Sequence, residues 1–153
     1  KKYNLKNNSS VLDVGCGKGF LLFEMKKLIP TLKVRGFDVS NHGLKNSKKE
    51  IKNFFFKHNA DKQFPFKNKS FDLVMTFACL HNLKLPGLCK ALKEIERVGK
   101  KKYVMVEGYR NEKELFNLQC WALTAECFFS DEEWKWIFRK SNYTGDYEFI
   151  YFE

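Results

Sequence analysis

The chain has 153 residues, which fits a single domain and is long enough to bury a core that draws on 16 phenylalanines. Its 28 Lys and Arg outnumber its 18 Asp and Glu, so the formal net charge is +10. The longest apolar run, at about residues 73–80, is far too short to span a bilayer, and we expect no membrane contact.

The positive charge invites a nucleic-acid interpretation, because a basic surface is the electrostatic footprint of phosphate binding. However, only four of the basic residues are Arg, the side chain that holds phosphates and bases with paired hydrogen bonds. The lysines are scattered along the chain. We therefore favour a solvated lysine-rich surface over a nucleic-acid partner, and the oligomeric state stays open.

The five cysteines form no Cys-x-x-Cys pair and no cluster with histidine, so the sequence predicts no metal site. An odd number of cysteines without a secretory signal favours a reducing, cytoplasmic location. The sequence does not begin with Met, so we expect it to start inside a longer gene product. We treat residues 1–153 as one domain.

The first predicted element is a buried strand at residues 11–14, which runs directly into a turn with glycine at positions 15, 17 and 19. A helix is expected at residues 20–28, ended by Pro30. Glycine backbone lets a ligand approach closely, and the first amides of a helix point toward it. Because position 20 is Phe, the spacing is Gly-x-Gly-x-Gly, which favours S-adenosylmethionine over a dinucleotide.

A second short strand ends at Asp38, about twenty residues after the glycine turn. A carboxylate at this place can accept hydrogen bonds from both hydroxyls of a ribose. The alternative is that Asp38 only caps the next helix together with Ser40. With the glycine turn upstream, the ribose interpretation is favoured.

The rest of the chain continues to alternate between strand and helix patterns. Further strands are expected at residues 54–58, 71–77, 102–107 and 146–153, and helices at 40–54, 86–98, 111–127 and 130–140. The last helix begins with a capping box, Ser-Asp-Glu-Glu. This alternation predicts an α/β fold of three layers, with a Rossmann-like doubly wound sheet that is mostly parallel. In such sheets ligands bind at the carboxyl ends of the strands.

Residues 11–107 resemble a class I S-adenosylmethionine-dependent methyltransferase of the small, ubiquinone-biosynthesis-like kind (methyltransferase type 11 domain). The resemblance rests on VLDVGCGKG at 11–19, GFDVS at 36–40, the region 59–74 and ALKEIERV at 91–98. It implies the strand order 3-2-1-4-5 with a C-terminal edge strand. Two departures leave the place of the last strand open: residues 99–102 read GKKK instead of Lys-Pro-Gly-Gly, and one strand instead of two follows Gly145.

The same resemblance implies which residues bind the cofactor, and its product S-adenosylhomocysteine. They are Asp13, Gly15, Cys16, Gly17, Gly19, Asp38, Val39, Ala60, Asp61 and Phe77. The glycines would border the methionine part, Asp13 would hold the loop or the cofactor's amino group, and Asp38 would bind the ribose. Asp61 would accept a hydrogen bond from the adenine amine, although it could instead be a turn residue that caps Gln63.

Methyl transfer needs mainly orientation and the exclusion of water, because the cofactor already carries the activated group. A general base helps when the acceptor is a hydroxyl, and His81, on the loop after the fourth strand, is the tentative catalytic residue. A packing role is the alternative for His81. Glu107, Tyr109 and Arg110 could face the acceptor, and Trp121 could form a pocket wall or belong to the core.

The expected function is methyl transfer to an oxygen or nitrogen of a small metabolite or biosynthetic intermediate. Methylation of nucleic-acid bases is disfavoured, because residues 76–79 contain no Pro and Cys79 follows Ala. The alternatives are an RNA-directed methyltransferase and a non-catalytic module that binds the cofactor.

Overall fold

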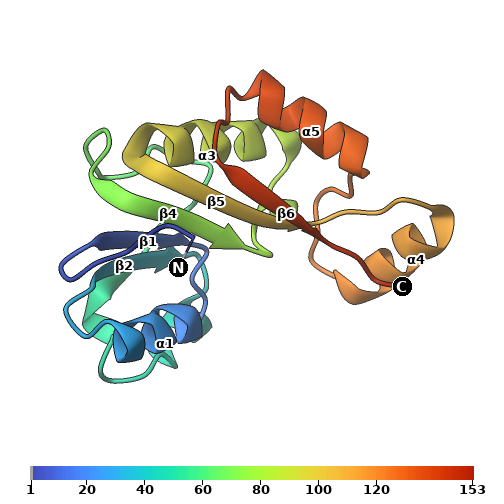
Figure 1. Ribbon diagram of the computed structural model, residues 1–153. Coiled ribbons are helices and arrows are strands. Elements are labelled where there is room, and N and C mark those ends of the chain that lie inside the picture. Colours follow the sequence, from blue (N-terminus) through green and yellow to red (C-terminus); the bar gives the residue numbers. More distant parts are fainter. Residues whose placement is uncertain (1) are drawn as a thin grey trace.

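A computed structural model of the chain describes residues 2–153. Its sheet has six strands in the order β3-β2-β1-β4-β5-β6, and every neighbouring pair is parallel (Figure 1). The strands are β1 (Ser10–Val14), β2 (Lys33–Asp38), β3 (Phe55–Lys57), β4 (Phe71–Phe77), β5 (Gly99–Glu107) and β6 (Asp146–Ile150). The predicted order and the C-terminal edge strand are confirmed.

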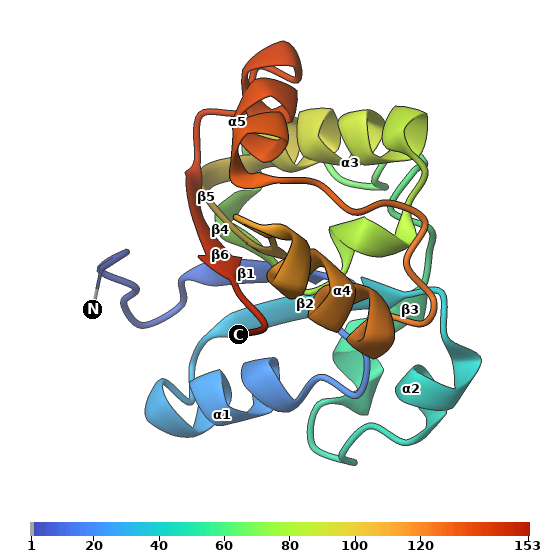
Figure 2. The same cartoon turned by 90° about the vertical axis from the view of Figure 1, so that its right-hand side faces the viewer.

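Helices cover both faces of this sheet, as expected for three layers. They are α1 (Phe20–Leu28), α2 (Asn41–Lys45), α3 (Leu85–Val98), α4 (Glu112–Trp121) and α5 (Asp131–Lys140), with short 3₁₀ turns η1 (Lys52–Phe54) and η2 (Leu80–Asn82). The first helix lies on one face, whereas α3 and α5 lie on the other (Figure 1). Figure 2 shows α4 in front of the carboxyl ends of the strands.

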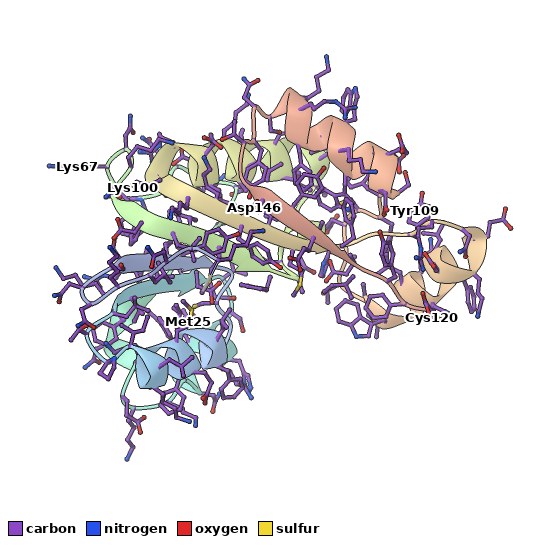
Figure 3. The ribbon with its side chains drawn as sticks, viewed as in Figure 1. Met25, Lys67, Lys100, Tyr109, Cys120 and Asp146 are labelled. Carbon is purple, nitrogen blue, oxygen red and sulfur yellow. The ribbon has the colours of Figure 1, made fainter. Side chains whose placement is uncertain are left out.

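The core has one part on each face of the sheet, because successive strand residues point to opposite faces. On the α1 face, Val11 and Met75 pack with Leu22, and Met25 joins this cluster from α1 (Figure 3). On the other face, Leu12 packs in a cluster that includes helix residues of α3 and α5. Burial of both faces explains the nearly continuous apolar strands.

The helix predicted for residues 40–54 is much shorter, since α2 ends at Lys45. The amide of Asn46 donates to the carbonyl of His42 at 2.8 Å, so its side chain satisfies a carbonyl at the helix end. After α2 the chain is not helical until η1. Ile51, the residue just before η1, has a buried side chain. Asn46 therefore closes α2 with both its side chain and its backbone N–H, which donates to the same carbonyl of His42 at 3.1 Å.

The helix predicted for residues 111–127 also ends early, at Trp121. Beyond it, the backbone N–H groups of Glu126 and Cys127 donate to the carbonyl of His81, at 2.8 and 3.3 Å. These contacts to a distant loop replace the helical hydrogen bonds of the segment. The capping box at Ser130 is confirmed, with Ser130 and Glu133 bonded in both directions.

The last strand, β6, lies parallel to β5, which settles the place that the sequence left open. Its register pairs Tyr103 with Asp146 and Glu107 with Ile150. Tyr3 packs its ring edge against Tyr103 and donates its hydroxyl to Asp146 at 2.8 Å. Tyr3 therefore lies on the α1 face of the sheet, beside β5 and β6.

Candidate cofactor site

The turn between β1 and α1 holds three glycines in the left-handed backbone region. Gly15, Gly17 and Gly19 have φ values of 76°, 52° and 70°, which residues with a Cβ atom rarely adopt. At Gly15 a Cβ would also lie 2.7 Å from the Cβ of Cys79, so the loop after β4 packs directly on the turn. The turn and the loop after β4 are thus in direct contact at the carboxyl edge of the sheet.

Asp38 ends β2 beside the glycine turn and is bonded to it. Its Oδ2 accepts from the N–H of Gly17 at 2.8 Å, and its Oδ1 accepts from the N–H of Ser40 at 2.8 Å. Each carboxylate oxygen has more than one lone pair, so both can still accept from a ligand. Asp38 therefore organises the turn and remains available to a diol.

A cavity of about 620 Å³ opens at the carboxyl ends of β1, β2 and β4, within the size range of small-molecule sites. Four predicted cofactor residues line it: Gly15, Asp38, Val39 and Ala60. The other lining residues are Phe37, Ser40, His58, Asn59, Ala78, Cys79, Asn82, Leu83 and Thr124. Thr124 belongs to the loop that was predicted as helix, and no motif marked it in the sequence.

Asp13 lies in β1, just before the turn, and is only 4% exposed. Burial, and to a lesser extent the charge of Asp38, raises the pKa of Asp13 to about 7. Cys16 is also buried, and its Sγ lies against Gly36 of β2. Both residues are therefore buried next to the turn, and neither lines the cavity.

We expect Asp13→Asn to stabilise the ligand-free protein at pH 8. The raised pKa means that the folded state holds a proton more tightly than the unfolded state. The free energy of unfolding of the wild type therefore falls as pH rises from about 4 to about 7, by about 1.4 kcal/mol for each pH unit in that window. Urea unfolding of both proteins at pH 4.5 and pH 8 measures this; an equal difference at both pH values would contradict it.

Asp61 is not brought to the cavity that holds Asp38. Its Cβ lies against Gly87 of α3, and its carboxylate forms an ion pair of 3.7 Å with Lys62. It lines a separate depression of about 290 Å³ together with Lys90 and Lys93. The predicted contact of Asp61 with adenine therefore requires its side chain to turn, whereas Asn59 and Ala60 already face the cavity.

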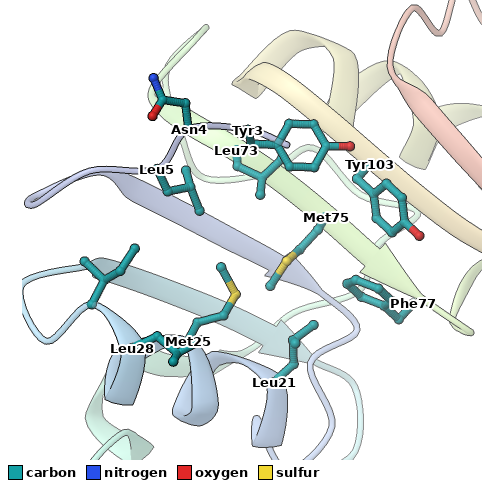
Figure 4. A pocket seen from close by; sticks show the side chains of 11 residues that line it. Tyr3, Asn4, Leu5, Leu21, Met25, Leu28, Leu73, Met75, Phe77 and Tyr103 are labelled. Carbon is teal, nitrogen blue, oxygen red and sulfur yellow. The ribbon is translucent and has the colours of Figure 1, made fainter. Parts of the chain in front are cut away.

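Phe77 also points elsewhere, onto the α1 face of the sheet. Its ring lies 5.3 Å from that of Tyr103, centre to centre. With Met25 and Met75 it lines an apolar cavity of about 730 Å³ (Figure 4). The next residue, Ala78, has a positive φ of 48° and lines the cavity at the glycine turn. Of these two neighbouring residues, Ala78 therefore faces the cavity at the glycine turn and Phe77 does not.

His81 is buried behind the cavity wall. Its Nδ1 lies 2.5 Å from Oε2 of Glu107, and its Nε2 lies 3.0 Å from Nδ2 of Asn82, which lines the cavity. Trp121 packs its ring against His81 and Phe152 and remains 52% exposed. The contact of His81 with the cavity thus runs through Asn82.

Tyr109 and Arg110, which were predicted to face the acceptor, follow the carboxyl end of β5. Arg110 pairs with Glu114 and, at 2.8 Å, with Glu153. Tyr109 forms a backbone bridge to Ser130 at the start of α5. These contacts tie the chain segments around α4 together.

A parallel αβα sheet, a glycine turn and a carboxylate at the end of the second strand together define a class I S-adenosylmethionine-dependent methyltransferase domain. This chain belongs to the methyltransferase domain family, whose sequence model matches residues 5–142. S-adenosylmethionine is the cofactor of that class.

The names of two curated relatives of the chain describe two different reactions, hydroxylation and methyl transfer. The mouse protein arginine-hydroxylase NDUFAF5, mitochondrial, is 33% identical over 117 residues, which cover 75% of this chain and 33% of that protein. Demethylmenaquinone methyltransferase of Chlorobaculum parvum is 32% identical over 98 residues, which cover 64% of this chain and 39% of the enzyme. The chain thus spans little more than a third of the length of these relatives.

Solved structures share the fold. The crystal structure of YcgJ from Bacillus subtilis matches with a TM-score of 0.75 and 19% identity, covering 92% of this chain and 64% of the other. Within residues 2–153, none of the helices has the length and apolar character to cross a membrane.

Proposed function

We propose that this chain binds S-adenosylmethionine in the cavity at the glycine turn and transfers its methyl group to an oxygen or nitrogen of a small molecule. The observation that carries the proposal is the meeting of Gly15, Asp38 and Ala60 around one cavity of about 620 Å³. These residues come from the ends of three different strands. Their joint arrangement supports binding of the cofactor that the family uses.

The chemistry of the lining suits an adenosyl group. Asp38 offers carboxylate lone pairs to a ribose diol, and a phosphate on that ribose would be repelled. Val39 is 56% exposed beside it, which gives an apolar contact for the flat face of adenine. The buried carboxyl of Asp13 supplies negative charge beneath the turn when it is ionised, which suits a cationic amino group.

The bound cofactor would supply an activated methyl group on its sulfonium. The chain would hold that group in place through the turn and Asp38, and position the acceptor for in-line attack. The helix α4 lies in front of the carboxyl edge, where it can help to exclude water (Figure 2). His81, predicted as a base or acceptor contact, could act there only through or after movement of Asn82.

Isothermal titration calorimetry with S-adenosylhomocysteine tests the cofactor assignment. We expect saturable binding at a single site, because the product carries the same adenosyl and amino-acid groups. Absence of heat from a protein with an intact circular dichroism spectrum would reject the proposal. Methyl transfer to any acceptor would in turn exclude the alternative of a non-catalytic cofactor-binding module.

A second candidate is hydroxylation of an arginine side chain, favoured by the 33% identity to arginine-hydroxylase NDUFAF5. Mass spectrometry of a treated acceptor separates the two, because methylation adds one CH₂ and hydroxylation adds one oxygen. An RNA acceptor would be indicated by retention on RNA that declines steeply with salt.

We also propose a reducing compartment such as the cytoplasm. All five cysteines are free thiols, including the exposed Cys120. Exposed free thiols persist best where glutathione keeps them reduced.

A further inference from the structure

A chain of hydrogen bonds connects the end of β5 with the loop after α4. Glu107 Oε2 lies 2.5 Å from Nδ1 of His81, and Nε2 of His81 lies 3.0 Å from Nδ2 of Asn82. The hydroxyl of Thr124 then donates to Oδ1 of Asn82 at 2.8 Å. Glu107 and His81 are buried, at 2% and 7% exposure, whereas Asn82 and Thr124 line the cavity.

Whether each group in this series of hydrogen bonds donates or accepts follows from its neighbour. A carboxylate only accepts, so Glu107 requires the proton of His81 on Nδ1. The Nε2 atom of a neutral ring then accepts, and it faces the amide nitrogen of Asn82, which donates. The oxygen of Asn82 is thereby turned toward Thr124.

The cavity wall formed by Asn82 and Thr124 therefore offers acceptors. The amide hydrogens of Asn82 are directed to His81 and, at 3.4 Å, to the carbonyl of Cys79. The single hydroxyl hydrogen of Thr124 is directed to Asn82. What remains for a bound molecule is a lone pair on Oδ1 of Asn82 and the lone pairs of Thr124.

We propose that Glu107 and His81 are positioning residues, which fix Asn82 so that this wall accepts a hydrogen bond from an N–H or O–H group of the bound cofactor. The inference rests on the proposed cofactor and deepens it, because it states that the cofactor presents a hydrogen-bond donor to Asn82 and Thr124, which line the same cavity as Asp38. A phosphate or carboxylate has no donor to offer at this wall. His81 then acts through Asn82 and not as a base.

The state of His81 is measured first, in the ligand-free protein. The chain has three histidines, so long-range ¹H–¹⁵N spectra of histidine-labelled protein at pH 7 resolve each ring, and His81→Gln identifies the signal. We expect the Nδ1–H form of a neutral ring. Glu107→Gln should retain it, because a glutamine oxygen can also accept, whereas Glu107→Leu should shift it toward Nε2–H. An Nε2–H or doubly protonated His81 in the wild type would overturn the proposal.

Calorimetry with S-adenosylhomocysteine and with 5′-methylthioadenosine, which lacks the amino-acid part, then tests the wall. We expect Asn82→Leu to weaken binding of S-adenosylhomocysteine about tenfold, as for loss of a hydrogen bond to a polar ligand. The matched control is Asn53→Leu, an exposed position in η1 outside the cavity lining, which should bind as the wild type does.

The two ligands locate the donor. A loss confined to S-adenosylhomocysteine assigns it to the amino-acid part, and an equal loss for both ligands assigns it to the nucleoside. If Asn82→Leu binds both ligands with unchanged affinity, the proposal that Asn82 accepts a hydrogen bond from the cofactor is wrong. Because Asn82 is exposed, we expect Asn82→Leu to fold. The binding measurement with this variant can therefore be made even if Glu107→Leu does not fold. If the wild type binds neither ligand, the proposed function is wrong instead. The His81 spectra would still show whether Glu107 holds His81 in the Nδ1–H form.

Discussion

Gly15→Ala is expected to destabilise the protein by about 2–5 kcal/mol and to abolish cofactor binding. Two costs add at this position. The φ of 76° costs a residue with a Cβ about 1–2 kcal/mol, and the new methyl would lie 2.7 Å from the Cβ of Cys79, an overlap that costs about 1–3 kcal/mol. Relief of the overlap would move the loop after β4, which lines the same cavity. Urea unfolding and calorimetry with S-adenosylhomocysteine measure the two effects.

Gly17→Ala is the matched control for this prediction. Gly17 has a similar positive φ of 52°, but no atom lies within 4 Å of the place of its Cβ. We expect a cost of about 1–2 kcal/mol from backbone strain alone. If Gly15→Ala and Gly17→Ala lose the same stability, the contact with Cys79 has no energetic weight and the explanation by overlap is wrong.

Asp38→Ala should weaken binding of S-adenosylhomocysteine by about 30-fold or more. It removes the carboxylate that would hold the ribose, a charged hydrogen bond of about 1.5–3 kcal/mol. It also removes the acceptor that holds the N–H groups of Gly17 and Ser40. We therefore expect a loss of stability in the ligand-free protein as well, of about 1–3 kcal/mol, in addition to the loss of affinity.

Asp72→Ala separates these two effects. Asp72 also accepts from a backbone N–H, that of Ser10 at 2.8 Å, and pairs with Lys100 at 2.9 Å. It stands at the start of β4, at the opposite edge of the sheet from Asp38. We expect a comparable loss of stability without a change in affinity. Equal losses of affinity in both variants would show that Asp38 acts through folding alone.

Much of the fold was predictable because its signals are local. A buried apolar strand, a glycine turn and a helix that ends before Pro30 each depend on residues a few positions apart. The capping box at Ser130 is likewise contained within four residues. The predictions failed where a distant partner decided the end of a helix: the backbone N–H groups of Glu126 and Cys127 donate to the carbonyl of His81 and not to a carbonyl one turn earlier.

The candidate site divides in the same way. Gly15 and Asp38 were found from the sequence because each stands at a strand end, and parallel strands bring those ends to one edge. The directions in which the side chains of Asp61 and Phe77 point could not be predicted from the sequence. A side chain's direction depends on its packing partners, which here are Gly87 and Tyr103.

The sequence alone predicted a parallel α/β sheet with a glycine turn at its carboxyl edge, and the resemblance of its motifs to a known family predicted a methyltransferase domain. The wall of Asn82 and Thr124 arose only in the tertiary structure. Those two residues lie 42 positions apart, and the loop after α4 reaches Asn82 by donating its backbone hydrogen bonds to His81. No periodicity encodes such a contact, because its partners are chosen by the packing of the whole chain.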